Sequence, residues 1–408
     1  MAVVLGLQEM VSPTAGGIAN MSLESKTKSN QQAFNKILII LPRQLGDILL
    51  GSSLAFAARS AFPQCQISWV SHPMGRQLLE GHPALNDVLY HPVWKSKPLS
   101  TWLKSPLHTI RELINHWRSE ILFFRKLRTA KFELVLDAIC TPKTALMSFI
   151  TGARHRHGLA TRWNRNWAYT WLCDASQWQK KYAAQARLEL LAPVLGLESV
   201  SHPHRDWLDS WMPVTLKMKE RVDGIVADLN LAPQKFVILS PTSRRPLRQW
   251  PGSSFVQLAE SLIAEDGMKI CWFWGPGEYD FTLELHHALQ ERLKLRNIDI
   301  NASCLPPLLS LGEAACMSGL SAVWIGNTNG LSHVAVAGGA RTVQIFGPTS
   351  HESWTHPDRS KHIPVQRDTG CVRCESNTCR TGTHECMKLL NVEDVLLAVR
   401  KLKMAFGH

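Results

Sequence analysis

Short apolar runs alternate with longer amphipathic segments along the chain from Lys36 onward. Runs that are rich in β-branched residues predict strands, and amphipathic segments of ten or more residues predict helices. The first series of predicted strands comprises 36–41 (KILIIL), 66–72 (QISWVSH), 87–92 (DVLYHP) and 132–138 (FELVLDA), with predicted helices over 52–62 and 144–150. This alternation is typical of βαβ units, in which a parallel sheet carries helices on both faces.

A second series follows an irregular, proline-bearing stretch, 201–213 (SHPHRDWLDSWMP), which we interpret as a linker. Its predicted strands are 236–242, 269–275, 322–327 and 341–348, and its predicted helices are 252–267, 311–319 and 330–339. The sequence therefore predicts an α/β fold of two Rossmann-like halves that face a central cleft. We expect a disordered leader over 1–34, a first lobe over 35–205, a second lobe over 206–390, and a final helix within 391–408.

The charge of the chain narrows the class of partner. With 45 Lys and Arg against 33 Asp and Glu, the formal net charge is +12, which favours an anionic partner: nucleic acid, an acidic membrane surface or a phosphorylated substrate. We find neither an apolar run long enough to span a membrane nor a signal peptide, so a cytoplasmic protein is expected.

Ligands of such sheets bind beyond the carboxyl ends of the strands. One loop of this kind, NTNGLSHVAVAGG, contains Asn327, Thr328, Asn329 and Gly330 and leads into a helix. A helix N-terminus attracts phosphate through its unpaired N–H groups and its dipole. The alternative is an ordinary helix cap formed by one of the two asparagines.

A second loop, PTSRRPLRQW, places hydroxyls and guanidinium groups at the equivalent edge. Its candidate residues are Thr242, Ser243, Arg244, Arg245 and Arg248. Arginine binds phosphate oxygens through two parallel hydrogen bonds, so this composition suits a diphosphate, although a solvated surface cluster is the alternative.

A third loop, GPGEYD, offers Gly275, Gly277 and the carboxylate of Glu278, which suits ribose hydroxyls or a base edge. It does not match the G-x-G-x-x-G fingerprint of dinucleotide sites, so a nicotinamide-dependent oxidoreductase is disfavoured.

Several of these motifs together resemble glycosyltransferase family 9, the lipopolysaccharide heptosyltransferases of Gram-negative bacteria. The resemblance runs from about Lys36 to Lys403 through ILIILPRQLGDILLGSSLAFAARSAFP, FELVLDA, SPTSRRPLRQWPGSS, SLGEAACMSGLSAVWIGNTNGLSHVAVAGG and the cysteine-bearing tail. It implies a GT-B fold with an acceptor lobe first and a sugar-nucleotide lobe second, and a final helix that crosses back to the first lobe. It also implies inversion at the anomeric carbon without a metal or other cofactor, and the chain contains no D-x-D pair in support of a metal.

The aspartate at the end of the first predicted strand matches the "GD" motif of this family. Asp47, next to Gly46, is therefore expected to act as the general base that takes the proton of the acceptor hydroxyl. We expect it to be an unpaired acid that faces a positively lined pocket on the second lobe. The alternative is that Asp47 caps a helix that begins near Ile48.

On the donor side, the resemblance assigns the diphosphate to the N–H groups of 328–330 and to Ser243, Arg244 and Arg248. His333 matches the histidine of the family's "G-x-x-H" motif and either touches the phosphate or packs beside it. The family commonly reads Asp-Thr-Gly or Asp-Ser-Gly where this chain reads Thr328-Asn329-Gly330. This departure bears on the choice of sugar nucleotide, and Asn327 is a candidate to replace part of the missing carboxylate's work.

The segment from Trp94 to Lys131 is basic and aromatic. It contains Lys95, Lys97, Lys104, Arg111, Arg118, Arg125, Lys126, Arg128 and Lys131 against Glu112 and Glu120, with Trp102, Trp117, Phe123 and Phe124 between them. Such a segment suits either an anionic membrane surface or an amphipathic helix with its aromatic residues in the core. No nucleic-acid motif accompanies it.

The tail CVRCESNTCRTGTHEC holds Cys371, Cys374, Cys379 and Cys386, with His384 beside the last cysteine. A zinc site and a structural tail are the two interpretations, and no ligand set is assigned.

Taken together, these features predict an inverting transferase that moves heptose from ADP-heptose, or a related sugar nucleotide, to a lipopolysaccharide core or lipid A acceptor. The expected place is the cytoplasm, at the inner face of the inner membrane. The alternative functions are those of a family member with another donor or acceptor, and of a non-catalytic GT-B scaffold that binds glycan or membrane.

Overall fold

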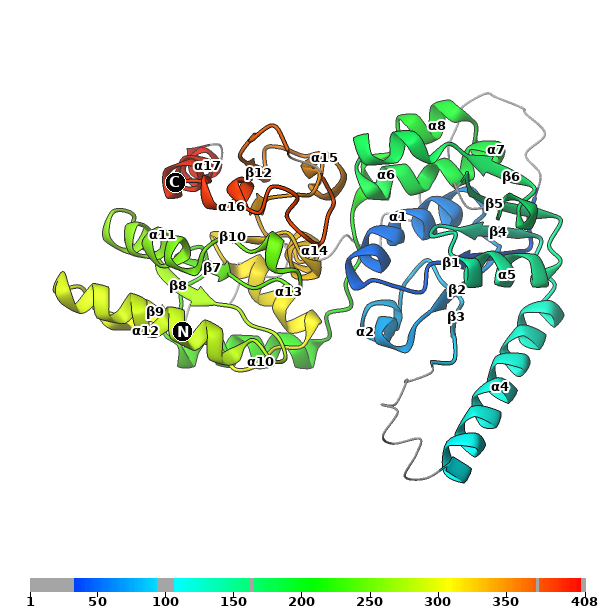
Figure 1. The fold of residues 1–408 in the computed structure, drawn as a ribbon, viewed down its shortest axis with the longest axis horizontal. Coiled ribbons are helices and arrows are strands. Elements are labelled where there is room, and N and C mark those ends of the chain that lie inside the picture. Colours follow the sequence, from blue (N-terminus) through cyan, green and yellow to red (C-terminus); the bar gives the residue numbers. More distant parts are fainter. Residues whose placement is uncertain (1–32, 94–105, 161–164, 372–373, 405–408) are drawn as a thin grey trace, which may run out of the picture. The chain divides into compact units, whose positions relative to one another are not determined.

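The structure is a computed structural model that describes residues 33–93, 106–160, 165–371 and 374–404. The expected leader lies almost wholly outside these residues. The described chain forms two parallel six-stranded sheets with helices around each (Figure 1). This arrangement confirms the predicted fold class.

The first sheet has the strand order β3-β2-β1-β4-β5-β6. Its strands are β1 (Lys36–Ile40), β2 (Gln66–Ser71), β3 (Asp87–Tyr90), β4 (Leu134–Asp137), β5 (His155–Leu159) and β6 (Trp171–Cys173). In the central pair, Ile37 of β1 lies beside Leu134 of β4. The order reverses between these two strands, which is the switch point of a Rossmann-like sheet.

The second sheet repeats the same topology, with the order β12-β11-β10-β7-β8-β9. Its strands are β7 (Phe236–Ser240), β8 (Lys269–Trp272), β9 (Ser303–Cys304), β10 (Val323–Asn327), β11 (Thr342–Phe346) and β12 (His362–Gln366). Here the switch point lies between β7 and β10, where Val237 pairs with Val323.

Apolar residues cover both faces of each sheet, because successive side chains of a strand point to opposite sides. In β1, Ile37 and Ile39 enter one hydrophobic cluster, whereas Leu38 enters another. In β7, Ile238 belongs to the cluster that also holds Ile37, and Leu239 belongs to a third. Because both faces of each sheet are buried, the central strands are continuous apolar runs rather than alternating apolar and polar residues.

The helices of the first half are α1 (Leu45–Ala61), α2 (Arg76–Leu79), α4 (Pro106–Thr129), α5 (Pro142–Thr151), α6 (Ala183–Leu188), α7 (Ala192–Leu195), α8 (Leu197–Ser201) and α9 (Arg205–Leu208). Those of the second half are α10 (Leu216–Asp228), α11 (Gly252–Ala264), α12 (Tyr279–Leu295), α13 (Leu311–Leu320), α14 (Gly330–Ala337), α15 (His351–Trp354), α16 (Glu385–Lys388) and α17 (Val392–Met404). Among the described residues, no helix combines the length and the apolar character needed to cross a bilayer.

Two helices, α1 and α17, bear on predictions made from the sequence. Helix α1 begins at Leu45, seven residues before the predicted start, which places Asp47 inside its first turn. Helix α17 packs on α11 and on the strands β11 and β12, and its apolar residues join the core of the second sheet. These contacts explain the position of α17 on the second sheet, and the expected crossing towards the first lobe stays a prediction.

Candidate active site

Most of the predicted site residues lie at the two switch points. Asp47 follows β1 in the first sheet, the loop from Thr242 to Arg248 follows β7, and Asn327 ends β10. Loops and helix N-termini collect at these positions in open α/β sheets, which makes them the usual ligand sites of the fold.

Asp47 is held from two sides in the first turn of α1. Its Oδ2 accepts a hydrogen bond from the backbone N–H of Gln44 at 3.2 Å. Its Oδ1 accepts one from Nη2 of Arg187 at 2.5 Å. The expectation of an unpaired acid is therefore wrong: the carboxylate caps its own helix and has a cationic partner. The Asp47 side chain is still 22% exposed, and a carboxylate has about four acceptor sites, so it can receive one more hydrogen bond.

Arg187 is the residue that sequence reasoning missed. It lies on α6, its side chain is only 6% exposed, and its Nη1 donates to the carbonyl of Ala183 at 2.9 Å. Its buried Nε has no hydrogen-bond partner among the described residues. A buried guanidinium needs an anionic partner, because removing its charge from water is costly. The segment AAQARLEL shows an isolated charge in an apolar stretch, but nothing in it points to a partner 140 positions away.

His333 lies beside this ion pair, on the first turns of α14. Its ring contacts Gly46 so closely that a Cβ added to this glycine would lie 2.8 Å from Cδ2 of the ring. Burial lowers the pKa of His333 to about 4; the Asp47 carboxylate opposes this shift and Arg187 adds to it. The imidazole is therefore neutral near pH 7, and it packs 5.9 Å from the ring of Trp354. Gly46 is needed here because only a residue without a side chain admits the ring.

The asparagines after β10 are turned inward. Asn327 is fully buried: its Oδ1 accepts from the N–H of Trp250 at 2.9 Å and its Nδ2 donates to the carbonyl of Pro241 at 2.7 Å. These bonds give it a scaffold role, rather than the donor contact predicted for it. Asn329 caps α14, because its Oδ1 accepts from the N–H groups of Leu331 and Ser332 at 2.8 and 3.1 Å.

The same loop therefore has few N–H groups left for a phosphate. The N–H of Thr328 donates to the carbonyl of Ile345 at 3.2 Å, and the Thr328 side chain is buried. Only the N–H groups of Asn329 and Gly330 have no hydrogen-bond partner among the described residues. The predicted phosphate contact now depends on these two amides.

The loop after β7 is strongly positive. Arg248 is desolvated, and its pKa is lowered first by burial and then by the charge of Arg245; Arg244 adds to this shift and Glu375 opposes it. The carboxylate of Glu375 forms an ion pair with Arg248, with 3.6 Å between Nη2 of Arg248 and Oε2 of Glu375. Guanidinium groups that repel one another, with a single counter-charge beside Arg248, form a site that an anion would stabilise.

Further hydrogen bonds connect the loops of the site. Nη2 of Arg244 donates to Oε1 of Gln44 at 2.8 Å, which joins the loop after β7 to the loop after β1. Oε2 of Glu278 accepts from the Thr242 hydroxyl at 2.7 Å and from the N–H of Gly275 at 2.8 Å. Glu278 thus ties the loops after β7 and β8 together. The hydroxyl of Ser243 accepts from the N–H of Arg245 at 3.3 Å.

The four tail cysteines line a common cavity of about 330 Å³ together with His384. Hydrogen bonds from the Thr381 hydroxyl and the His384 N–H lower the pKa of Cys379 to about 7, whereas burial raises that of Cys386. Within the described part of the chain, no group of three or more His, Cys, Asp or Glu residues is placed to hold a metal.

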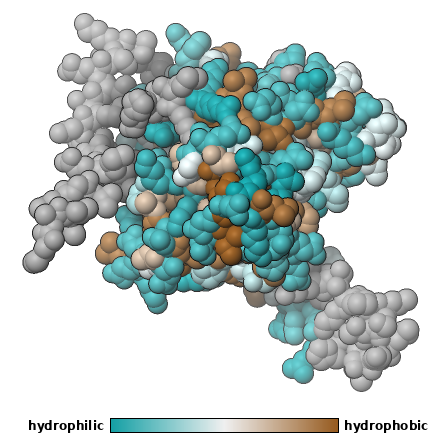
Figure 2. All heavy atoms as spheres, turned by 90° about the vertical axis from the view of Figure 1, so that its left-hand side faces the viewer, coloured by the Kyte–Doolittle hydropathy of each residue, from teal (hydrophilic) through white to brown (hydrophobic). Residues whose placement is uncertain are grey.

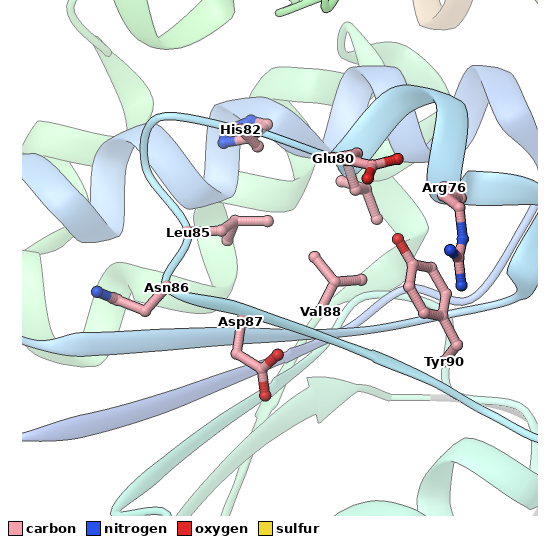
Figure 3. Close-up of a pocket in the computed structure, with 10 residues that line it drawn as sticks. Arg76, Glu80, His82, Leu85, Asn86, Asp87, Val88 and Tyr90 are labelled. Carbon is pink, nitrogen blue, oxygen red and sulfur yellow. The ribbon is translucent and has the colours of Figure 1, made fainter.

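A second cavity, of about 340 Å³, lies beside β3 in the first lobe (Figure 3). The guanidinium of Arg76 stands over the ring of Tyr90 at 4.8 Å on one side of it, and the Glu80 carboxylate lies near them. None of the predicted site residues lines this cavity.

The sequence profile of the family described as "Glycosyltransferase family 9 (heptosyltransferase)" matches residues 121–384, which is more than half of the chain. The chain belongs to glycosyltransferase family 9. It is thus a glycosyltransferase of the lipopolysaccharide heptosyltransferase family, as the motifs predict.

Two relatives in this family show how far the similarity extends. Lipopolysaccharide heptosyltransferase 2 of Salmonella typhimurium is 23% identical over 372 residues, which cover 90% of this chain and 98% of the relative. Lipopolysaccharide heptosyltransferase 1 of Pseudomonas aeruginosa is 26% identical over 370 residues, which cover 88% of this chain and 91% of the relative. The solved structure of ADP-heptose lipopolysaccharide heptosyltransferase II of Escherichia coli has a TM-score of 0.64 at 19% identity, and covers 90% of this family 9 chain and 98% of its own. At this identity the last similarity shows the shared GT-B fold.

Proposed function

We propose that the protein transfers heptose from ADP-heptose, or a related sugar nucleotide, to a lipopolysaccharide inner-core acceptor by a single displacement with inversion. The observation that carries this proposal is the contact between the two switch points: the Asp47 carboxylate after β1, and an arginine loop after β7 that is bonded to it through Gln44. Relatives named as heptosyltransferases along nearly the whole chain support the choice of sugar.

In the proposed reaction, a hydroxyl of the acceptor attacks the anomeric carbon of the heptose. The bond from that carbon to the diphosphate oxygen breaks, and ADP leaves with both electrons of the bond. The proton of the attacking hydroxyl passes to the carboxylate of Asp47. Arg187 acts as a positioning residue, because its hydrogen bond to Oδ1 fixes the orientation of the carboxylate while Oδ2 is held by the helix terminus.

On the donor side, negative charge grows on the diphosphate as the bond breaks. Arg244, Arg248 and the N–H group of Gly330 are the groups proposed to stabilise it, since preorganised donors stabilise a developing charge more than the initial state. The neutral ring of His333 is proposed to close the site beside Gly46 rather than to carry a proton, because its pKa of about 4 is far below neutral pH.

The acceptor in this proposal is anchored in a membrane by its lipid part. We therefore also propose peripheral contact with an anionic membrane surface, at the inner face of the inner membrane. The exposed basic residues of α4 support this part of the proposal.

The proposed function is tested by incubating the protein with ADP-heptose and a core acceptor that lacks the heptose, and by measuring both ADP release and the mass of the acceptor. We expect one ADP for each heptose added, with inverted configuration at the new bond. Transfer from another sugar nucleotide, with none from ADP-heptose, would show that the donor is that sugar nucleotide rather than ADP-heptose. Binding of ligands with no transfer to any acceptor would support a non-catalytic scaffold.

A further inference from the structure

Helix α4 presents an uncovered apolar row to solvent. Ile110, Ile114, Trp117 and Ile121 are between 51% and 61% exposed, and they follow one another at intervals of four, three and four residues. At about 100° per residue this spacing places them along one side of the helix. Large apolar side chains that are exposed in a row, rather than singly, mark an interaction surface.

The face that α4 uses within its own lobe is a different one. Phe123 and Leu127 are buried in the core of the first lobe, and Glu120 is buried where it accepts a hydrogen bond from Lys143 at 2.8 Å. The interpretation as an amphipathic helix with aromatic residues in the core holds for Phe123, whereas Trp117 is exposed. Contact of the segment with an anionic membrane surface stays a prediction. Figure 1 shows α4 extending beyond the first sheet for much of its length. Residues 94–105, which contain Trp102, lie outside the described residues.

Arginines flank the apolar row on its solvent side. Arg111, Arg118 and Arg125 are exposed and recur every seven residues, so each lies three or four positions from members of the row. The two acids of this helix lie elsewhere: Glu120 is on the buried face and Glu112 is half-buried on the side away from the row. The exposed half of α4 is therefore apolar and cationic with no acid in it.

This combination favours lipid over a second copy of the chain. The spacing of the row also suits a coiled coil, in which flanking charges face the partner helix. Two copies of α4 would bring arginine rows together with no acidic row to meet them. An anionic bilayer accepts both features at once, since apolar side chains enter the acyl boundary and arginines meet the phosphates of the head groups.

More exposed apolar side chains lie on α5, which α4 packs against, and on the short turn Asn166–Ala168 beside α5. Phe149 of α5 is 49% exposed and Trp167 is 54% exposed, and their ring centroids are 5.0 Å apart. Arg156 lies over the ring of Phe149 at 5.9 Å. Aromatic rings with a cation beside them are typical of the membrane–water interface.

We propose that α4 docks the acceptor lobe on an anionic lipid surface, with the row from Ile110 to Ile121 in the interface and Arg111, Arg118 and Arg125 at the head groups. This inference deepens the proposed function by assigning the membrane contact to one face of α4 and by adding an apolar row to its basic residues. It rests on that function only for the reason that a lipid-anchored acceptor would bring the enzyme there.

The test measures binding of the full chain to vesicles of phosphatidylethanolamine and phosphatidylglycerol, with phosphatidylcholine vesicles for comparison. We expect binding to the anionic vesicles that weakens with salt. The variant Ile114→Ser, Trp117→Ser, Ile121→Ser should bind at least about tenfold more weakly. The variant Arg111→Gln, Arg118→Gln, Arg125→Gln should lose about a hundredfold at low salt, together with the salt dependence.

A matched control changes three exposed leucines on the second lobe: Leu216→Ser, Leu295→Ser and Leu397→Ser, which are 66–85% exposed in the native chain. Figure 2 shows the face towards the ends of α11, α12 and α17, where hydrophobic residues reach the surface between hydrophilic ones. Binding of this control should equal that of the native chain. Circular dichroism and thermal unfolding check that every variant is folded, as is expected for substitutions at exposed positions.

The proposal is overturned if the native chain does not bind anionic vesicles, or if the α4 variant binds them as well as the control does. It is also overturned if the native chain is a dimer in solution that the α4 variant converts to a monomer while neither binds vesicles, because the occupant is then a second copy. Vesicle binding needs neither donor nor acceptor, so its failure leaves the proposed transfer untouched. If transfer fails but vesicle binding is normal, the proposed function is wrong and the docking surface is still supported.

Discussion

The two switch points share one topology but carry opposite chemistry. After β1, a single carboxylate is held between a helix terminus and one buried guanidinium, and it stays partly open to solvent. After β7, the guanidinium groups of Arg244 and Arg245 lie near that of Arg248, and the Glu375 carboxylate pairs with Arg248 at 3.6 Å. The comparison teaches that the strand order determines where the loops gather, whereas the loop residues determine the charge that each switch point offers to a ligand.

Removing charge from the positive loop should have the largest effect. The double change Arg244→Ala, Arg248→Ala removes two charge-assisted hydrogen bonds to a diphosphate, so ADP should bind about 100- to 1000-fold more weakly by calorimetry. Lys235→Ala is the matched control, because Lys235 is exposed near the opposite end of β7, and it should bind ADP normally. If the double variant loses less than about threefold in ADP affinity, the diphosphate does not bind to this loop.

Breaking the Asp47–Arg187 ion pair after β1 should lower the stability of the protein rather than weaken donor binding. In Arg187→Met, Asp47 loses a charge-assisted bond from a buried partner, so the free energy of unfolding in urea should fall by about 2–3 kcal/mol. Arg205→Met is the control, since its guanidinium is 66% exposed in a 2.9 Å ion pair with Asp358. This surface pair should contribute no more than about 1 kcal/mol. Equal losses in both variants would mean that burial does not distinguish Arg187.

A pH measurement isolates the histidine that lies beside the pair. The folded-state pKa of His333 is about 4, below the value near 6.5 of an unfolded chain, so the unfolded state binds more protons between these values. The stability that this histidine contributes is present above about pH 6.5 and is lost as the pH falls towards 4. By linkage, about 2 kcal/mol of it is lost at pH 5.

The variant His333→Gln should therefore lose less stability than the native protein between pH 7.5 and pH 5. Other buried histidines with lowered pKa values, such as His82 and His362, are present in both proteins and cancel in the difference. Parallel stability curves for the two proteins would contradict the burial of an uncharged ring at this site.

The bridge between the two loops should have the smallest effect. Gln44→Ala removes the exposed hydrogen bond from Arg244 but leaves both charges in place, so ADP affinity should change by less than about threefold. A larger loss would show that the two switch points act on the donor together rather than separately, and calorimetry with ADP decides between these outcomes.

Sequence reasoning reached the fold class and located the candidate site residues at strand ends, because both depend on local patterns. Strands such as β1 and β7 are continuous apolar runs because they are buried on both faces, and motifs directly after them lie at the switch points. It missed β5, whose sequence HRHGL is polar and gains its place only from neighbouring strands. It also missed the roles that depend on tertiary contacts: Asp47 gains a partner from α6, and the side chain of Asn327 bonds to two other loop segments.

The central claim is that Asp47 takes the proton in the transfer, and the variant Asp47→Asn tests it most directly. The amide keeps the shape of the side chain but is not a base, so kcat for heptose transfer should fall by about 10²- to 10⁴-fold while calorimetry shows unchanged ADP binding. Asp280→Asn, in the first turn of α12, should keep the native rate. Transfer by Asp47→Asn at the native rate would contradict the account.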